Sequence, residues 1–209
     1  MVKSFLFSKK VFCVDIFIFQ NATLYIKCYV YFYPLKGLFM RPTKNDISLT
    51  KRTKLADMLN LLLADAVDLK TQAKQAHWNV KGENFIALHE LFDQVATEVE
   101  ADVDLIAERV VQLGGVALGT ARVAAKQSRL KEYPLSITES DKHVDAFSSA
   151  IGTFNASARQ AVDDAAELGD AITSDMLTQI VSGLDKQLWF VESHLEKIAT
   201  AKGKVSRIK

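Results

Sequence analysis

Cysteine is nearly absent from this 209-residue chain, because only Cys13 and Cys28 occur and both lie in the first 39 residues. The rest of the chain therefore cannot rely on disulfides, which suits a reducing compartment. Proline is also rare, with single residues at positions 34, 42 and 134. Since proline interrupts helices, the stretches without it can form long, unbroken ones.

The sequence also lacks a long apolar run without charges, as a membrane span of about 18 or more residues would need. Within residues 1–39, Asp15, Gln20–Asn21 and Lys27 interrupt every such window, and no small-residue cleavage site of a secretory signal follows. This segment holds seven of the twelve Phe and four of the five Tyr, so it differs from the remainder. We favour a true start at Met40; a lineage-specific extension and a weak membrane anchor are the alternatives.

The net charge of +1 hides a strong asymmetry along the chain. Residues 40–54 carry five basic side chains and one acidic one, and residues 197–209 carry five basic ones and no acid, whereas residues 55–196 carry 23 acids and 11 bases. This pattern argues against a uniformly basic DNA-binding domain. We expect a basic N-terminal arm at 40–54, an acidic folded domain at 55–200 and a basic C-terminal tail at 201–209.

Apolar residues recur at steps of three and four over four long stretches, which predicts amphipathic helices. We expect them from about Ser48 to His77, from Asn84 to Gly114–Gly115, from Ser140 to Leu168, and from Thr173–Ser174 onward. Trp189 and Phe190 are expected in the core. The connection 114–139 is too long for a hairpin loop and predicts a crossover, with room for a short helix. The fold class is therefore all-α, a four-helix bundle of ferritin-like connectivity.

Metal-ligating residue types gather on the second of these helices. His89 and Asp93 are four residues apart, as are Asp104 and Glu108, and His77 lies just upstream. Residues four apart share a helix face, and imidazole with carboxylates is a ligand set for iron, manganese or zinc. Each residue alone is more often an ordinary surface group. The grouping of all five predicts a metal site.

The spacing between the two pairs restricts how such a site can form. Asp93 and Asp104 share a face to within about 20°, yet they lie about 16 Å apart along the helix axis. One metal centre cannot reach both on one straight helix. Two copies of the helix, antiparallel across a two-fold axis, would bring the pairs together and create two equivalent sites. A second helix of the same chain is the alternative source of the missing ligands.

The stretch from His77 to Gly115 resembles the Dps family, the ferritin-like DNA-protection proteins of starved bacteria. The family signature is a His, then about twelve residues later His-x-x-x-Asp, then Asp-x-x-x-Glu, and it is matched by His77, His89, Asp93, Asp104 and Glu108. The resemblance covers about residues 40 to 200. Further matching segments are Trp78–Asn79, Gly82, Phe85, Ala107–Glu108–Arg109, Leu113–Gly114–Gly115, Glu132–Tyr133–Pro134–Leu135 and the run from Asp185 to Ser193.

The resemblance implies an iron site shared between two subunits, with His77, His89 and Asp93 from one chain and Asp104 and Glu108 from its neighbour. It also implies that Trp78 lies beside the iron, where it could accept an electron; the alternative is an ordinary interface or core aromatic. The Glu-x-x-His motif of di-iron sites within one bundle is absent. His143 and His194 are expected to be ordinary surface or packed histidines.

The function implied by the resemblance is that of a ferroxidase, which oxidises Fe²⁺ with hydrogen peroxide and stores Fe³⁺ mineral in a hollow dodecamer. The resemblance also implies that the protein binds double-stranded DNA without sequence preference. It would then lie in the cytoplasm, at the nucleoid, and would not bind a membrane. Two alternatives remain: an iron-storage cage that does not bind DNA, and a structural or adhesive bundle without metal chemistry. The expected DNA-binding residues are Arg41, Lys44, Lys51, Arg52, Lys54, Lys202, Lys204, Arg207 and Lys209.

Overall fold

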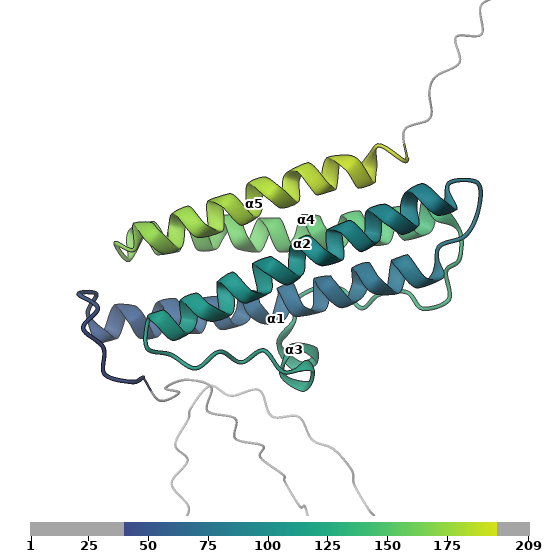
Figure 1. The fold of residues 1–209 in the computed structure, drawn as a ribbon. Helices are drawn as coiled ribbons and strands as arrows, with labels where there is room; N and C mark the ends of the chain where they lie inside the picture. Colours follow the sequence, from purple (N-terminus) through teal and green to yellow (C-terminus); the bar gives the residue numbers. More distant parts are fainter. Residues whose placement is uncertain (1–39, 196–209) are drawn as a thin grey trace, which may run out of the picture. The chain divides into compact units, whose positions relative to one another are not determined.

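The computed structural model describes residues 40–195, which form four long helices and one short one (Figure 1). In chain order the helices are α1 (Leu49–Asn79), α2 (Phe85–Gln112), α3 (Ala121–Gln127), α4 (Ser140–Glu167) and α5 (Ala171–Glu192). The predicted all-α bundle with a long crossover is confirmed, and α3 is the short helix within that crossover. No helix of residues 40–195 is long and apolar enough to cross a membrane.

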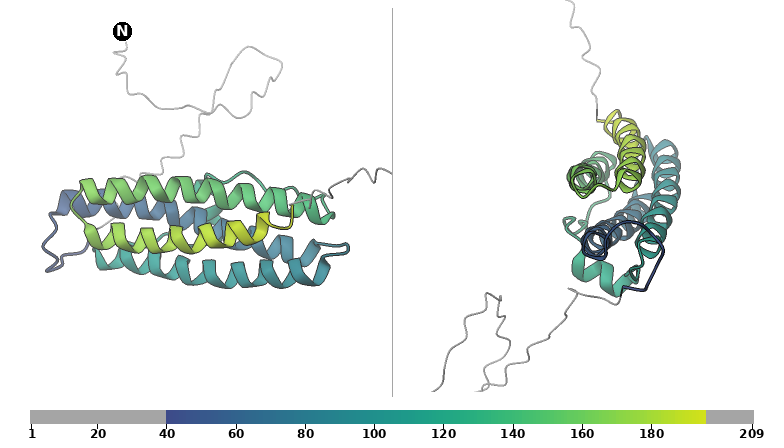
Figure 2. Two further views of the ribbon diagram at one scale, coloured as in Figure 1. Left: turned by 90° about the horizontal axis from the view of Figure 1, so that it is seen from above. Right: turned by 90° about the vertical axis from the view of Figure 1, so that its left-hand side faces the viewer.

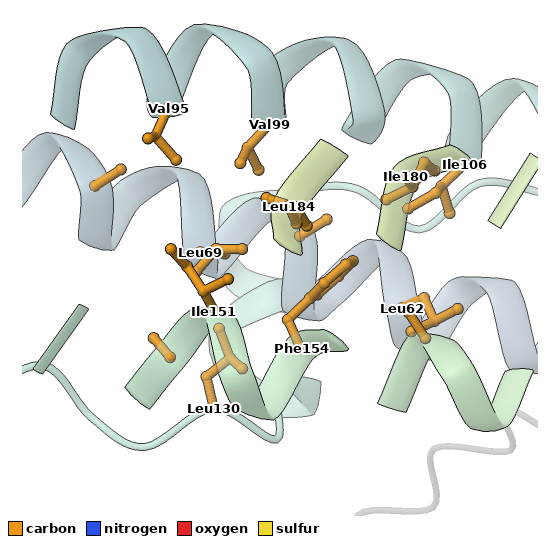
Figure 3. Close-up of a cluster of buried hydrophobic side chains, with 14 of the residues drawn as sticks. Leu62, Leu69, Val95, Val99, Ile106, Leu130, Ile151, Phe154, Ile180 and Leu184 are labelled. Carbon is orange, nitrogen blue, oxygen red and sulfur yellow. The ribbon is translucent and has the colours of Figure 1, made fainter. Parts of the chain in front are cut away.

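The bundle consists of two helical hairpins. α1 packs along α2, and α4 packs along α5; α1 also contacts α4, and α2 contacts α5 (Figure 2). All four long helices and the crossover contribute to the core between the hairpins (Figure 3). Each large apolar side chain buried there contributes roughly 1.5–3 kcal/mol. The core residues labelled in Figure 3 are Leu62, Leu69, Val95, Val99, Ile106, Leu130, Ile151, Phe154, Ile180 and Leu184.

Two glycines end long helices, and the sequence predicted Gly114 as one of these ends. Gly114 follows α2 with a φ of +92°. Its N–H donates to the Val111 carbonyl, and the N–H of Gly115 donates to the Val110 carbonyl. Gly169 ends α4 in the same way, with a φ of +79°. This is the hydrogen-bond pattern that satisfies the last carbonyls of a helix, and it needs a residue that tolerates positive φ.

The start of α5 differs from the prediction. The helix begins at Ala171, and its cap is Asp170, whose carboxylate accepts the backbone N–H of Thr173 at 3.1 Å. Thr173 and Ser174, which we expected to cap the helix, instead lie in its first turn. Asp is as good a cap as Ser or Thr, so the sequence offered two starts and the earlier one prevails. Asn84 does occupy the cap position of α2, although its side chain makes no capping bond.

Polar side chains of α1 hold the crossover along the bundle. Asp65 is fully buried, and its carboxylate accepts the backbone N–H and the guanidinium of Arg129. One turn on, Asp68 accepts the hydroxyl of Ser128, and Gln72 donates to the Lys131 carbonyl. Since an unpaired buried carboxylate is costly, these contacts fix the path of the chain between the two hairpins.

Two single residues lie differently from what the sequence suggested. Trp189 is 64% exposed, because it lies one residue beyond Leu188 and therefore about 100° off the apolar stripe of α5. Arg52 is 7% exposed, so it is not an open basic side chain of an arm. Its guanidinium donates to the carbonyls of Ile47 and Leu113, both at 2.9 Å or less, and thereby ties the start of α1 to the end of α2.

Candidate metal centre

Two histidines meet across the α1–α2 hairpin. His77 lies near the end of α1 and His89 near the start of α2, and the turn that brings them together includes Gly82 with a φ of +117°. Each imidazole Nδ1 hydrogen-bonds the backbone carbonyl of the other residue, at 2.7 Å from His77 and 2.9 Å from His89. The rings stack with centroids 3.7 Å apart. The pairing of the helices therefore fixes both rings.

This arrangement also sets the tautomer of each ring. A carbonyl oxygen can only accept, so Nδ1 must carry the proton on both His77 and His89. The lone pair then lies on Nε2, which is the state of a neutral histidine that binds a metal. Both side chains are partly exposed. The structure therefore presents two oriented imidazoles whose Nε2 atoms could bind a metal at the surface of the bundle.

Asp93 adds a carboxylate one turn after His89. Its side chain is 50% exposed, and Lys74 of α1 donates to it at 2.5 Å. This hydrogen bond lowers the pKa of Asp93 more than burial raises it, and the charge of Lys74, with that of His77 and His89 when they are protonated, lowers it further. Both imidazoles thus lie close enough to act on the carboxylate. We call His77, His89 and Asp93 the imidazole half-site.

The other two predicted ligands lie farther along the same helix. Asp104 and Glu108 are both exposed, and α2 is unbroken from Phe85 to Gln112, so the axial separation of about 16 Å from Asp93 stands. We call Asp104 and Glu108 the carboxylate half-site. Within residues 40–195 of one chain, no three His, Cys, Asp or Glu side chains gather as a metal site, so His77, His89 and Asp93 do not form one by themselves. One chain therefore brings two separated halves.

Apolar side chains are exposed beside both halves. Trp78 is 67% exposed, which excludes the alternative of a core aromatic within the chain. Ile86 is 61% exposed near the imidazole half-site, and Leu105 is 48% exposed next to Asp104. Phe85, at 38% exposure, has its ring 5.1 Å from that of His89. Apolar groups at this density suit a surface that another protein chain covers.

Asp102 is a further carboxylate of α2, but it lies on the inner face of the helix and not on the face of Asp104. It is the one polar residue in the apolar stripe of this helix, two positions from Asp104 and so about 200° around the helix from it. Burial, with a further contribution from the charge of Glu98, raises the pKa of Asp102 to about 7. It is therefore not a further member of the carboxylate half-site.

Sequence reasoning missed two contacts that shape the site. The first is the Lys74–Asp93 ion pair, for which the only signal is that Lys74 lies three residues before His77. The second involves Arg109, which follows Glu108. Its guanidinium donates to both carboxylate oxygens of Asp170, at 2.8 and 2.9 Å, and to the Thr173 hydroxyl. This buried contact fixes the end of α2, and with it the carboxylate half-site, against α5.

The predicted DNA-binding residues fall into three groups. Arg41, Lys44, Lys51 and Lys54 are exposed, and the last two lie in the first turns of α1 rather than on a separate arm. Arg52 is the buried exception described above, and its position favours a structural role. The remaining four lie outside the described residues: Lys202, Lys204, Arg207 and Lys209.

This chain is similar in sequence and in structure to a group of known proteins. The sequence model of the ferritin-like domain matches residues 56–201. A DNA protection during starvation protein of Agrobacterium fabrum is 43% identical over 155 residues, which cover 74% of this chain and 96% of that protein. The protein of that name from Brevibacillus brevis is 34% identical, over 68% of this chain and 95% of its own length. Among solved structures, DpsC from Streptomyces coelicolor superimposes with a TM-score of 0.74 at 30% identity, covering 77% of this chain and 94% of that one.

Proposed function

Since the chain belongs to the Dps family of ferritin-like proteins, we propose that it is a ferroxidase that oxidises Fe²⁺ with hydrogen peroxide. The Fe³⁺ product is stored as a mineral inside a hollow dodecamer of identical chains. Each oxidation site is shared by two subunits: the imidazole half-site comes from one and the carboxylate half-site from the other.

The observation that carries this proposal is the reciprocal hydrogen bonding of His77 and His89. It leaves both Nε2 atoms free to bind a metal, beside a carboxylate and at an exposed surface. Three ligands from one helix pair leave iron with open positions. Asp104 and Glu108 lie on the same face of α2, so a two-fold axis between antiparallel copies supplies them from the neighbour.

The chemistry follows from the electron count. One hydrogen peroxide molecule takes two electrons from two Fe²⁺ ions, its O–O bond breaks, and two Fe³⁺ and two hydroxide ions result. Because both electrons come from iron within one protein, no hydroxyl radical is released. The residues of the two half-sites hold the ions close together, so that two-electron transfer competes with single-electron steps in solution.

Peroxide-driven iron oxidation on the purified assembly tests this proposal. A variant that combines His77→Ala, His89→Ala and Asp93→Ala should lose rapid oxidation while its assembly size stays that of the wild type. A matched variant, His194→Ala with Asp145→Ala, removes similar groups elsewhere and should oxidise iron normally. Unchanged kinetics in the first variant would refute the site.

We further propose that the assembly binds double-stranded DNA without sequence preference, in the cytoplasm and at the nucleoid. Exposed lysines near the start of α1 and the basic C-terminal residues would contact phosphates, and many copies on one particle would add their weak affinities. Such binding should weaken steeply as salt increases. The competing function is an iron store that does not bind DNA.

Gel retardation at several salt concentrations separates the two functions. Deleting residues 197–209 and replacing Lys44, Lys51 and Lys54 by Gln should abolish retardation. Substitution is preferable to deleting residues 41–54, because Arg52 holds α1 to α2. Gln at three exposed lysines of the body, Lys81, Lys131 and Lys186, is the control and should leave retardation unchanged. A wild-type protein that never retards DNA would favour the plain iron store.

A further inference from the structure

Two lysines on one face of α1 each pair with a carboxylate of α2. Lys70 contacts Glu100, and Lys74 Nζ lies 2.5 Å from Asp93 Oδ1. The pairs are similar in exposure, with the lysines 31% and 32% exposed and the carboxylates 60% and 50%. They differ in one respect. Glu100 belongs to neither half-site, whereas Asp93 is the carboxylate of the imidazole half-site.

Lys74 therefore places a positive charge at the oxygen that a metal ion would use. An ammonium group and a metal cation compete for the same lone pairs and repel each other, so both cannot stay at Asp93. The ammonium also lies at the edge of a second attractive group. Lys74 Nζ is 5.8 Å from the centre of the Trp78 ring, within cation–π range, so it can move closer to the indole face when it leaves Asp93.

We propose that Lys74 is a built-in competitor for the metal ion at Asp93. It holds the carboxylate in place until Fe²⁺ displaces it, and its ammonium group then moves closer to the face of Trp78. This inference rests on the proposed function, because it takes Asp93 as a metal ligand. Lys74 is thus a positioning residue, since it acts on the metal through Asp93 and Trp78.

The strength of the ion pair suits this role. A partly exposed pair is weak, so it orients the carboxylate without preventing metal binding. Once displaced, the ammonium still lies near a dication and opposes its binding. Removing the charge at position 74 should therefore tighten metal binding, by about three- to ten-fold. A purely structural ion pair would leave the affinity unchanged or, by loosening Asp93, weaken it.

Zn²⁺ binding to the assembled protein tests the inference without iron oxidation. Zn²⁺ accepts the same imidazole and carboxylate ligands and has no redox chemistry. Zn²⁺ binding is measured by calorimetry. Only the sites that are lost in the double variant His77→Ala with His89→Ala are counted. The change Trp189→Phe leaves Trp78 as the single indole, so its emission reports whether Lys74 moves. Lys74→Gln should bind Zn²⁺ about three- to ten-fold more tightly, with a smaller emission change on binding.

Two controls match this variant closely. Lys74→Arg keeps the charge and should keep wild-type affinity, and Lys70→Gln removes the neighbouring pair and should also leave affinity unchanged. If Lys74→Gln binds no more tightly than wild type, or if Lys70→Gln tightens binding equally, the inference is wrong while the histidine-dependent site stands. If wild type shows no histidine-dependent Zn²⁺ site, the proposed function fails, and the inference fails with it.

Discussion

His77 and His89 each donate Nδ1–H to the backbone carbonyl of the other, so two imidazoles twelve residues apart are held in one orientation and one tautomer. Each acceptor is a backbone atom, which a side-chain substitution at the partner leaves in place. The rings also stack against each other. The pair is therefore a fixed element of the hairpin, held by contacts within one chain.

Removing one imidazole should leave the other with its hydrogen bond but without its stacking partner. We therefore expect His77→Ala and His89→Ala each to fold normally and to bind Fe²⁺ at least about ten-fold more weakly. Anaerobic Fe²⁺ titration by calorimetry measures this, with thermal unfolding as the check on folding. His194→Ala is the control and should match wild type. Wild-type Fe²⁺ affinity in either single variant would argue against direct ligation by that ring.

The buried contact between Arg109 and Asp170 should dominate the stability of its end of the bundle. Asp170 is 2% exposed and Arg109 8%, so Arg109→Ala leaves a buried carboxylate without its main partner. We expect a loss of about 3–5 kcal/mol in the free energy of unfolding. Arg159→Ala breaks the exposed Arg159–Asp185 pair and should cost less than about 1 kcal/mol. Urea unfolding of both variants gives the comparison, and equal losses would contradict it.

The same contact should affect unfolding in acid. Burial raises the pKa of Asp170, but its bonds with Thr173 and Arg109 outweigh this and leave the pKa below its ordinary value. A carboxyl group with a lowered pKa in the folded state stabilises the fold above its unfolded pKa, and this contribution disappears as pH falls through the folded value. Asp170→Asn should therefore lower stability at pH 7 and lessen its fall between pH 5 and pH 2. The free energy of unfolding of wild type and Asp170→Asn, measured across this pH range, tests the prediction. An equally steep fall in both proteins would contradict it.

His143 should make stability depend on pH in a higher range. Its side chain is 1% exposed and its Nδ1 lies 2.7 Å from the Tyr133 hydroxyl. Burial lowers the pKa of His143, although nearby backbone groups of Ile137 and Asn79 and the Glu139 carboxylate oppose the shift. The unfolded chain then takes up the proton first, so stability is complete above about pH 6.5 and falls as pH decreases below it.

The measurement is urea unfolding at pH 7.5 and at pH 5.5. Wild type should lose stability between the two, and His143→Gln should lose less, because no proton is taken up at this position. His194→Ala keeps the buried histidine and should retain the wild-type difference. A difference that persists fully in His143→Gln would assign the pH dependence to other groups.

Much of this fold follows from local sequence signals. Apolar spacing gives the four long helices, and Gly114 and Gly169 mark two helix ends, because each signal acts within one turn. The start of α5 was misplaced because Asp170 competes with Thr173 as a cap. Trp189 was misplaced because a neighbour of an apolar stripe is easily counted within it.

The candidate site was predictable only in part. Spacing identifies the ligand types and their shared face, because these depend on the geometry of one helix. The tautomers of His77 and His89, the Lys74–Asp93 pair and the burial of Arg52 depend on how α1 is aligned with α2. That alignment results from the whole interface between the two helices, so no short segment of sequence specifies it.

Complementation between two inactive variants tests most directly whether two chains share one iron site. One variant carries His77→Ala, His89→Ala and Asp93→Ala, and the other carries Asp104→Ala and Glu108→Ala. In a mixed two-fold pair, one site receives all five native ligands and the other receives none. Each variant alone should be inactive in peroxide-driven iron oxidation. Assemblies reformed from an equal mixture should regain about a quarter of the wild-type sites. Mixed assemblies that contain both chains and remain inactive would contradict the shared site.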